Sequence, residues 1–251
     1  MKRYIRLSII FLGLLSCTAK DSTQFVLLEN FSFPRESDPI LSELFTGNHK
    51  ITALETTKFS LLGPIDKIKK FMGDYYICSS NGRSIHRFNN EGKFISSLEK
   101  QGQGPEEYHR IEDFDICEDN GSVEVWISDN RNLKVYDTTD FTYKYQISFP
   151  FIIHKFKRID SSRILLVTGL NDYILTLTDM NGKVISEYLE KEIPFLMFRP
   201  VQFTACQSYS IFQLGISNSF VAFDSQTNTF KKGYFANKKE LLTEKQLLDF
   251  F

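Results

Sequence analysis

Short runs of alternating apolar and polar residues follow one another along the chain, separated by turns rich in glycine, asparagine and aspartate. Such alternation is typical of half-buried β-strands. Four segments share the order strand, polar loop, strand, polar turn, strand. They read YYICSSNGRSIHRFNNEGKFI, VEVWISDNRNLKVYDTTDFTY, ILLVTGLNDYILTLTDMNGKVI and YSIFQLGISNSFVAFDSQTNTF. The pattern therefore predicts an all-β fold built by repetition of one unit.

The length of the repeat indicates which all-β fold this is. In each segment an apolar residue lies three positions before an aromatic residue or leucine, at Ile85/Phe88, Leu133/Tyr136, Ile174/Leu177 and Phe220/Phe223. The second members of these pairs are 48, 41 and 46 residues apart. A period in the forties with short strands is typical of a β-propeller, whose blades are four-stranded antiparallel meanders. We therefore expect four to five blades within residues 41–235, with hairpin turns at 89–92 and 180–182.

The first residues have the layout of an export signal. Three basic residues precede a mainly apolar run, 7–15, about half as long as a membrane-spanning helix requires. The residues LLSC, which end at Cys17, resemble the lipobox of bacterial lipoproteins. The resemblance implies that residues 1–16 are a signal peptide, that Cys17 is the lipid attachment site, and that residues 17–40 form a lipidated N-terminus and linker. We then expect an exported protein anchored in a membrane by lipid, at the outer membrane on its periplasmic or its cell-surface side.

The last residues change from strand to helix periodicity. In residues 236–251, Asn237 is placed to cap a helix, and Glu240 follows three positions later. Apolar residues then recur at helical spacing. We expect a short C-terminal helical tail after the last blade.

The charge balance excludes one class of partner. Loss of residues 1–16 removes three of the 30 basic residues, which leaves 27 against 31 acidic residues and a formal net charge of −4. Binding to a phosphate backbone requires a basic surface. We therefore expect no nucleic-acid partner.

Two motifs resemble a known family. Residues 41–68, LSELFTGNHKITALETTKFSLLGPIDKI, are similar to the N-terminal segment of the six-bladed β-propeller lipoproteins of Bacteroidetes-type bacteria, which are relatives of NHL-repeat propellers. Residues 102–108, GQGPEEY, resemble the Gly-x-Gly-Pro-x-Glu-Tyr loop of that family. The resemblance implies a secreted propeller lipoprotein with no established activity. Members of the family usually continue for further blades beyond the position of Phe251.

A shortened chain changes how the ring closes. Residues 50–57 are expected to form a strand that pairs with the last blade in the complete family. Without that blade the strand must pair elsewhere or leave an exposed edge. The chain is then either an open arc of four to five blades or a truncated product without an independent role.

Strand order in a meander indicates which loops share a face. If the first strand of each blade starts at the top face, the loops after second strands and the links between blades also lie there. Ligands of propellers generally bind at this face. The candidate ligand-binding residues in these loops are Arg83, Glu106, Glu107, His109, Arg110, Asp129, Arg131, Asn171, Asp172 and Asn218. Asp129 and Asn171 could equally form hydrogen bonds within their own turns.

Metal and cofactor signatures are missing from the sequence. The four histidines are far apart, and Cys78, Cys117 and Cys206 are widely spaced and odd in number, so we interpret these cysteines as small residues in strands. The loop GQGPEEY lacks the third glycine or the lysine of a phosphate-binding loop. We therefore assign no catalytic residue, no metal and no cofactor.

The functional alternatives differ in what the top face does. Glu106 and Glu107 are adjacent in one loop, whereas glycoside hydrolysis requires two carboxylates that face one cavity. The sequence favours a cell-envelope binding or interaction module for a glycan, a peptide or a partner protein. The alternative is a polysaccharide hydrolase or lyase that uses acids and arginines around the channel.

Overall fold

A computed structural model of the chain describes residues 26–28, 50–119, 121–191, 203–213 and 219–235. The expected signal peptide, the lipid attachment site Cys17, the helical tail 236–251 and the candidate Asn218 lie outside these residues. Every helix or strand in the described part is a β-strand, so the all-β prediction is confirmed.

The strands form four sheets, and in each of them four consecutive strands pair antiparallel as a meander. Blade 1 consists of β2 (Ile65–Phe71), β3 (Asp74–Ser79), β4 (Ser84–Phe88) and β5 (Phe94–Leu98). Blade 2 consists of β6 (Asp113–Asp119), β7 (Ser122–Asp129), β8 (Asn132–Asp137) and β9 (Tyr143–Ser148). Blade 3 consists of β10 (Ile152–Arg158), β11 (Arg163–Gly169), β12 (Tyr173–Asp179) and β13 (Val184–Glu190). Blade 4 consists of β14 (Thr204–Cys206), β15 (Tyr209–Gln213), β16 (Ser219–Asp224) and β17 (Thr229–Phe235).

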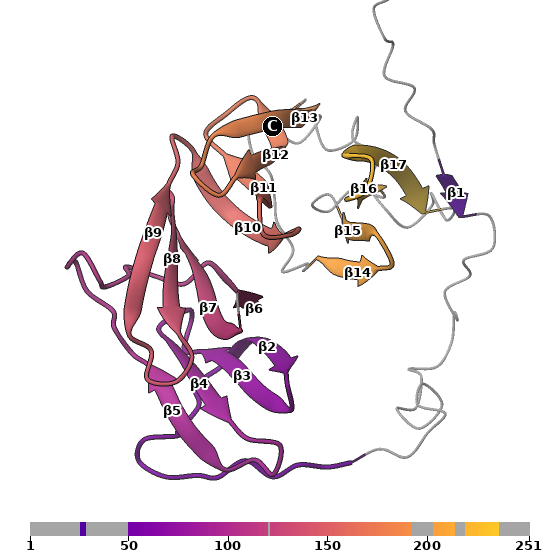
Figure 1. Ribbon diagram of the computed structural model, residues 1–251. Coiled ribbons are helices and arrows are strands. Elements are labelled where there is room, and N and C mark those ends of the chain that lie inside the picture. Colours follow the sequence, from indigo (N-terminus) through magenta and orange to yellow (C-terminus); the bar gives the residue numbers. More distant parts are fainter. Residues whose placement is uncertain (1–25, 29–49, 120, 192–202, 214–218, 236–251) are drawn as a thin grey trace, which may run out of the picture.

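The four sheets are arranged around a common centre, which is the arrangement of a β-propeller (Figure 1). The first strands β2, β6 and β10 lie on the side of their sheets that is nearest this centre. An additional strand, β1 (Val26–Leu28), pairs parallel with β17 on the outer edge of blade 4. The described residues thus contain four blades, within the expected four to five, and the six-bladed form of the resembled family is not confirmed.

The equivalent pairs inferred from the repeat occupy equivalent places. All four pairs lie in the third strand of a blade, β4, β8, β12 or β16. In each of these strands the apolar residue of the pair is at position 2 and the aromatic residue or leucine is at position 5. Phe88, Tyr136, Leu177 and Phe223 are fully buried. The period in the forties therefore measures one blade.

Hydrophobic side chains fill the spaces between adjacent blades. In β7, Val125 and Ile127 belong to the cluster between blades 1 and 2, whereas Trp126 between them packs toward blade 3. In β11, Leu166 likewise faces blade 2 and Leu165 faces blade 4. Because both faces of these inner blades are covered, their strands contain continuous apolar runs instead of strict alternation. Burial of this surface, at roughly 25 cal/mol per Å² of apolar area, is the main favourable term that joins the blades.

The expectation for residues 50–57 was wrong. This segment forms no strand, and the strand that pairs with the last described blade is β1 instead. Glu55 N donates to Gly92 O at 2.8 Å, and the Glu55 carboxylate accepts a hydrogen bond from Phe94 N at 2.9 Å. Because these bonds attach the segment to the β4–β5 turn of blade 1, it covers that turn and does not extend a sheet.

The link between blades 1 and 2, residues 99–112, is held by one buried tyrosine. Tyr108 is fully buried, and its hydroxyl lies 2.7 Å from Arg83 O and 3.0 Å from Leu98 O, to which it can donate. The same hydroxyl accepts a hydrogen bond from Lys100 N at 3.2 Å. Tyr108 thereby satisfies backbone groups of blade 1 and of the link at once.

Tyr108→Phe removes this hydroxyl and leaves buried backbone groups without a partner. We expect the free energy of unfolding to fall by about 1–3 kcal/mol, measured by urea denaturation. Tyr145→Phe is the control, because Tyr145 lies on the outer strand β9 and is 36% exposed, and it should change the free energy of unfolding by less than about 0.5 kcal/mol. Equal effects of the two substitutions would contradict the role assigned to Tyr108.

Candidate functional site

The loops that the strand order assigns to the top face do lie together. Gly82 O in the β3–β4 turn accepts a hydrogen bond from Ile111 N in the link at 2.9 Å. In the β7–β8 turn, Arg131 O accepts from Phe149 N of the next link at 2.9 Å, and Asn130 O accepts from Ile153 N at the start of β10 at 2.8 Å. Links and second-to-third-strand turns therefore share one end of the propeller, which we call the top face.

Several candidate residues hold the top-face loops in place. The Asp129 carboxylate accepts hydrogen bonds from His109 N and Arg110 N at 3.1 and 3.2 Å, so it fixes the link rather than its own turn. Glu107 Oε2 accepts from Gly104 N at 2.8 Å, and a Cβ atom at Gly102 would collide with this carboxylate. The glycines of GQGPEEY thus make room for Glu107, and they do not serve to cradle an anion.

The candidates Arg131, Asn171 and Asp172, in two other top-face turns, also form hydrogen bonds within the protein. Arg131 Nη1 donates to Pro150 O at 2.9 Å. Lys191 Nζ donates to Asn171 O and Oδ1 at 2.6 and 2.9 Å, and Lys191 N donates to Asp172 O at 2.8 Å. These contacts tie each of these turns to a neighbouring link or strand, and the nine candidates in the described part of the chain do not converge on one cavity.

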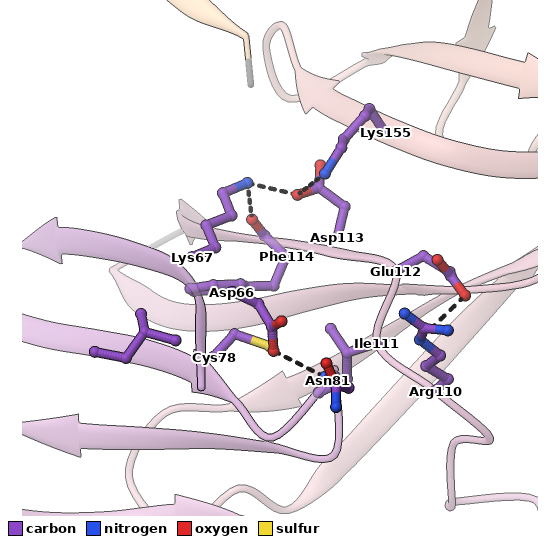
Figure 2. Close-up of a pocket in the computed structure, with 12 residues that line it drawn as sticks. Asp66, Lys67, Cys78, Asn81, Arg110, Ile111, Glu112, Asp113, Phe114 and Lys155 are labelled. Atoms are coloured by element: carbon purple, nitrogen blue, oxygen red, sulfur yellow. Dashed lines mark hydrogen bonds and ion pairs between the residues drawn. The ribbon is translucent and has the colours of Figure 1, made fainter. Parts of the chain in front are cut away.

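One cavity opens beside the link, with a volume of about 330 Å³. It lies between the start of β2, the β3–β4 turn, the end of the link, the start of β6, and β10 (Figure 2). Among the candidates only Arg110 lines it. The side chains of Arg83, Glu106 and His109 are exposed nearby and are not part of its wall. The polar residues that line it are Asp66, Lys67, Asn81, Arg110, Glu112, Asp113 and Lys155.

The floor of the cavity is a charged layer that spans three blades. Lys67 of β2 and Lys155 of β10 approach Asp113 of β6 from opposite sides (Figure 2). Lys67 Nζ lies 2.6 Å from Asp113 Oδ1 and also donates to Phe114 O at 2.6 Å. Lys155 Nζ lies 3.6 Å from the same Oδ1, while Phe156 N donates to Oδ2 at 3.3 Å. Asp113 therefore joins blades 1, 2 and 3.

A second charged layer repeats this arrangement two residues further along the same strands. Lys69 Nζ lies 3.0 Å from Asp115 Oδ1, and Lys157 Nζ lies 3.3 Å from Asp115 Oδ2. We call the two layers the lysine–aspartate ladder. Its members are Lys67, Lys69, Asp113, Asp115, Lys155 and Lys157, four cations and two anions.

Burial and neighbouring charge act on the ladder in opposite directions. Burial lowers the pKa of Lys67 below its ordinary value, although the adjacent Asp113 carboxylate opposes the shift. Burial would raise the pKa of Asp115, but Lys69 and Lys157 outweigh it and lower the pKa of that carboxyl. Removal of one partner from such a buried pair leaves an uncompensated charge, which typically costs about 3–5 kcal/mol.

The sequence interpretation missed the ladder, although a signal was present. The three inner strands contain Lys-x-Lys at 67–69, Asp-x-Asp at 113–115 and Lys-x-Lys at 155–157. Residues two apart in a strand lie on the same face. Each of these strands has two like charges on one face, and the charge is positive in the first strand, negative in the second and positive in the third. This alternation would have indicated ion pairs between the inner strands of neighbouring blades.

The cavity contains one thiol, Cys78 of β3. Burial, with the nearby Asp66 and Asp113 carboxylates, raises the pKa of Cys78 to about 12, so the thiol is protonated at neutral pH and is a poor nucleophile. Cys78 is buried and Cys117 half-buried, and neither forms a disulfide. The side chain of Cys206 lies outside the described residues.

Within the described part of the chain, no three or more His, Cys, Asp or Glu side chains gather in a way that could hold a metal ion. Among the same residues, no helix has the length and apolar character needed to cross a membrane.

The meanders, their circular arrangement and the shared top face define the protein as a β-propeller. Within that class, the chain belongs to the family described as "Domain of unknown function (DUF4934)", whose profile matches residues 32–242. None of the curated proteins matches the chain significantly.

A solved bacterial structure resembles the chain in fold. The crystal structure of a "putative exported protein" from Bacteroides fragilis has 19% sequence identity and a TM-score of 0.62, with 73% of this chain and 54% of that chain covered. This chain therefore spans about half the length of the Bacteroides fragilis protein. The WD40 domain of Neurospora crassa Pan2 has 16% identity and a TM-score of 0.46, with 69% of this chain and 52% of that chain covered.

The ladder predicts how stability responds to acid. The pKa of Asp115 is lower in the folded state than its ordinary value of 3.8, so its stabilisation is complete above that value and is lost as the pH falls through the folded pKa. We expect the melting temperature of the wild type to fall more steeply below about pH 4 than that of Asp115→Asn, which is already destabilised at pH 7. Parallel melting curves of the two proteins between pH 7 and pH 2 would contradict this assignment.

Proposed function

We propose that the protein is an exported, lipid-anchored lipoprotein of the cell envelope whose propeller is a binding or interaction module. Its ligand is a glycan, a peptide or a partner protein held at the top face. The lipobox-like residues before Cys17 support the anchor. The exported-protein name of the Bacteroides fragilis structure supports export.

The observation that carries this proposal is the polar cavity at the top face. Its walls include strands of three different blades, so Lys67, Asp113 and Lys155 are held on a rigid scaffold. A concave site of this kind, built on rigid elements, is the usual form of a ligand site.

Binding is favoured over hydrolysis because the most buried carboxylate in the cavity is already occupied, and the other two, Asp66 and Glu112, are exposed to solvent. Lys67 Nζ lies against one oxygen of Asp113, and Phe156 N donates to the other. A catalytic carboxylate must be able to exchange a proton with substrate or to attack it. Asp113 instead stabilises the junction of the inner strands.

A panel of polysaccharides and peptides tests the proposed binding function. We expect saturable binding of at least one member, measured by calorimetry, with no product formed on prolonged incubation. The double substitution Arg83→Ala and Arg110→Ala at the top face should weaken binding by about tenfold, since a rim charge contributes on the order of 1.4 kcal/mol. Lys183→Ala, in the β12–β13 turn at the opposite face, is the matched control and should bind as the wild type does. Turnover of any polysaccharide would contradict a pure binding role.

Cys17→Ser tests the anchor separately. We expect the wild-type protein to incorporate labelled fatty acid and to sediment with membranes, because several acyl chains hold a protein stably on a bilayer. The variant should lose the label and become soluble after export. An unlabelled wild-type protein would contradict the lipoprotein assignment and leave the ligand-binding proposal unaffected.

A further inference from the structure

We propose, resting on the binding function above, that the cavity recognises a sugar acid, meaning a carboxylate-bearing residue of an acidic glycan. The inference combines two cationic donors without a hydrogen-bond partner among the described residues, two carboxylates with unused acceptor capacity, and a lining in which positive and negative groups are equal in number.

The cationic donors are Lys155 and Arg110. Lys155 Nζ lies 3.6 Å from Asp113, and Arg110 Nε lies 3.6 Å from Glu112, both beyond hydrogen-bond distance. Neither charged group donates a hydrogen bond to another described residue of the chain. The Lys155 side chain is nevertheless only 18% exposed, so a ligand anion there would meet a cation that is partly withdrawn from water. Charge-assisted hydrogen bonds to a carboxylate are the strong kind that such groups form.

The acceptors line the same cavity. Asp66 Oδ2 accepts a hydrogen bond from Gly82 N at 2.9 Å, which leaves Oδ1 available. The Glu112 side chain is 40% exposed, and among the described residues its carboxylate has the long contact with Arg110 and no hydrogen bond. Asn81 adds an amide, which both donates and accepts. Carboxylates and amides at these positions suit hydroxyl groups, which donate to them.

The charges that line the cavity indicate which kind of ligand fits. Three cations, Lys67, Arg110 and Lys155, are matched there by three carboxylates, Asp66, Glu112 and Asp113, so the lining favours a ligand with a single carboxylate and neutral polar groups over a polyanion. The next inner strand, β14, has the sequence Thr-Ala-Cys and supplies no further anion. A peptide anchor would require an apolar pocket, whereas most residues that line this cavity are charged or polar. A sugar acid supplies the carboxylate and the uncharged hydroxyls together.

The first test uses ligands matched in every group except the charge. The full chain, purified in detergent, is titrated with short oligomers of galacturonate, glucuronate and mannuronate, and with the methyl ester of each oligomer. We expect at least one acid to bind about 10- to 100-fold more tightly than its ester, because the ester retains the hydroxyls and lacks the charge-assisted bonds. Added salt should weaken binding of the acid and leave binding of the ester unchanged.

The second test assigns the carboxylate to the cavity. Lys155→Gln and Arg110→Gln should each lower affinity for the acid by about tenfold or more and leave affinity for the ester unchanged. Lys93→Gln is the matched control, because Lys93 is 69% exposed in the β4–β5 turn at the opposite face. Thermal melting verifies that each variant is folded. If Lys155→Gln does not fold, the exposed Arg110 carries the test alone.

The outcomes separate the two proposals. Equal affinity for acid and ester, equal loss with Lys93→Gln, or binding of free glutamate in place of the uronates would overturn the sugar-acid assignment. Binding of a neutral glycan or a peptide alone would overturn it too, and would leave the proposed binding function standing. Failure of every ligand, acidic, neutral and peptide, would overturn both.

Discussion

The propeller depends on two aspartates that lie between lysines of neighbouring blades. Asp113 and Asp115 of β6 each lie within 4 Å of one lysine from β2 and one from β10, so a single strand connects three sheets near the centre. Apolar clusters between the blades supply most of the favourable free energy, but they are non-directional. The ion pairs depend on distance and direction, so they fix the positions of β2, β6 and β10 along the strand axis relative to one another.

Much of the fold could be predicted, because it follows from local periodicity. Ile85/Phe88 and its counterparts marked the third strand of every blade, and the loop order placed the links and turns on one face. The prediction for residues 50–57 failed because what holds that segment is a pair of hydrogen bonds from the Glu55 region to residues 92 and 94, nearly forty positions away. Contacts at such separation leave no periodic signal.

The candidate site was harder to predict for a related reason. Loop polarity pointed to ten residues, yet Asp129 and Glu107 serve to hold the link, and only Arg110 lines the cavity. The other charged groups of the cavity come mostly from inner strands, where a lysine or aspartate would ordinarily be read as solvent-exposed. These groups pair with one another because the fold brings together three strands that are far apart in the chain. The residues of any one strand do not indicate that pairing.

The parallel pairing of β1 with β17 has a mechanical consequence for an anchored protein. Val26, the first residue of β1, is nine residues from Cys17, so a lipid at that cysteine would be connected to the outer edge of blade 4 by a tether no longer than about 30 Å. Such an anchor would hold the propeller by the outer edge of blade 4 and keep that edge within about 30 Å of the bilayer.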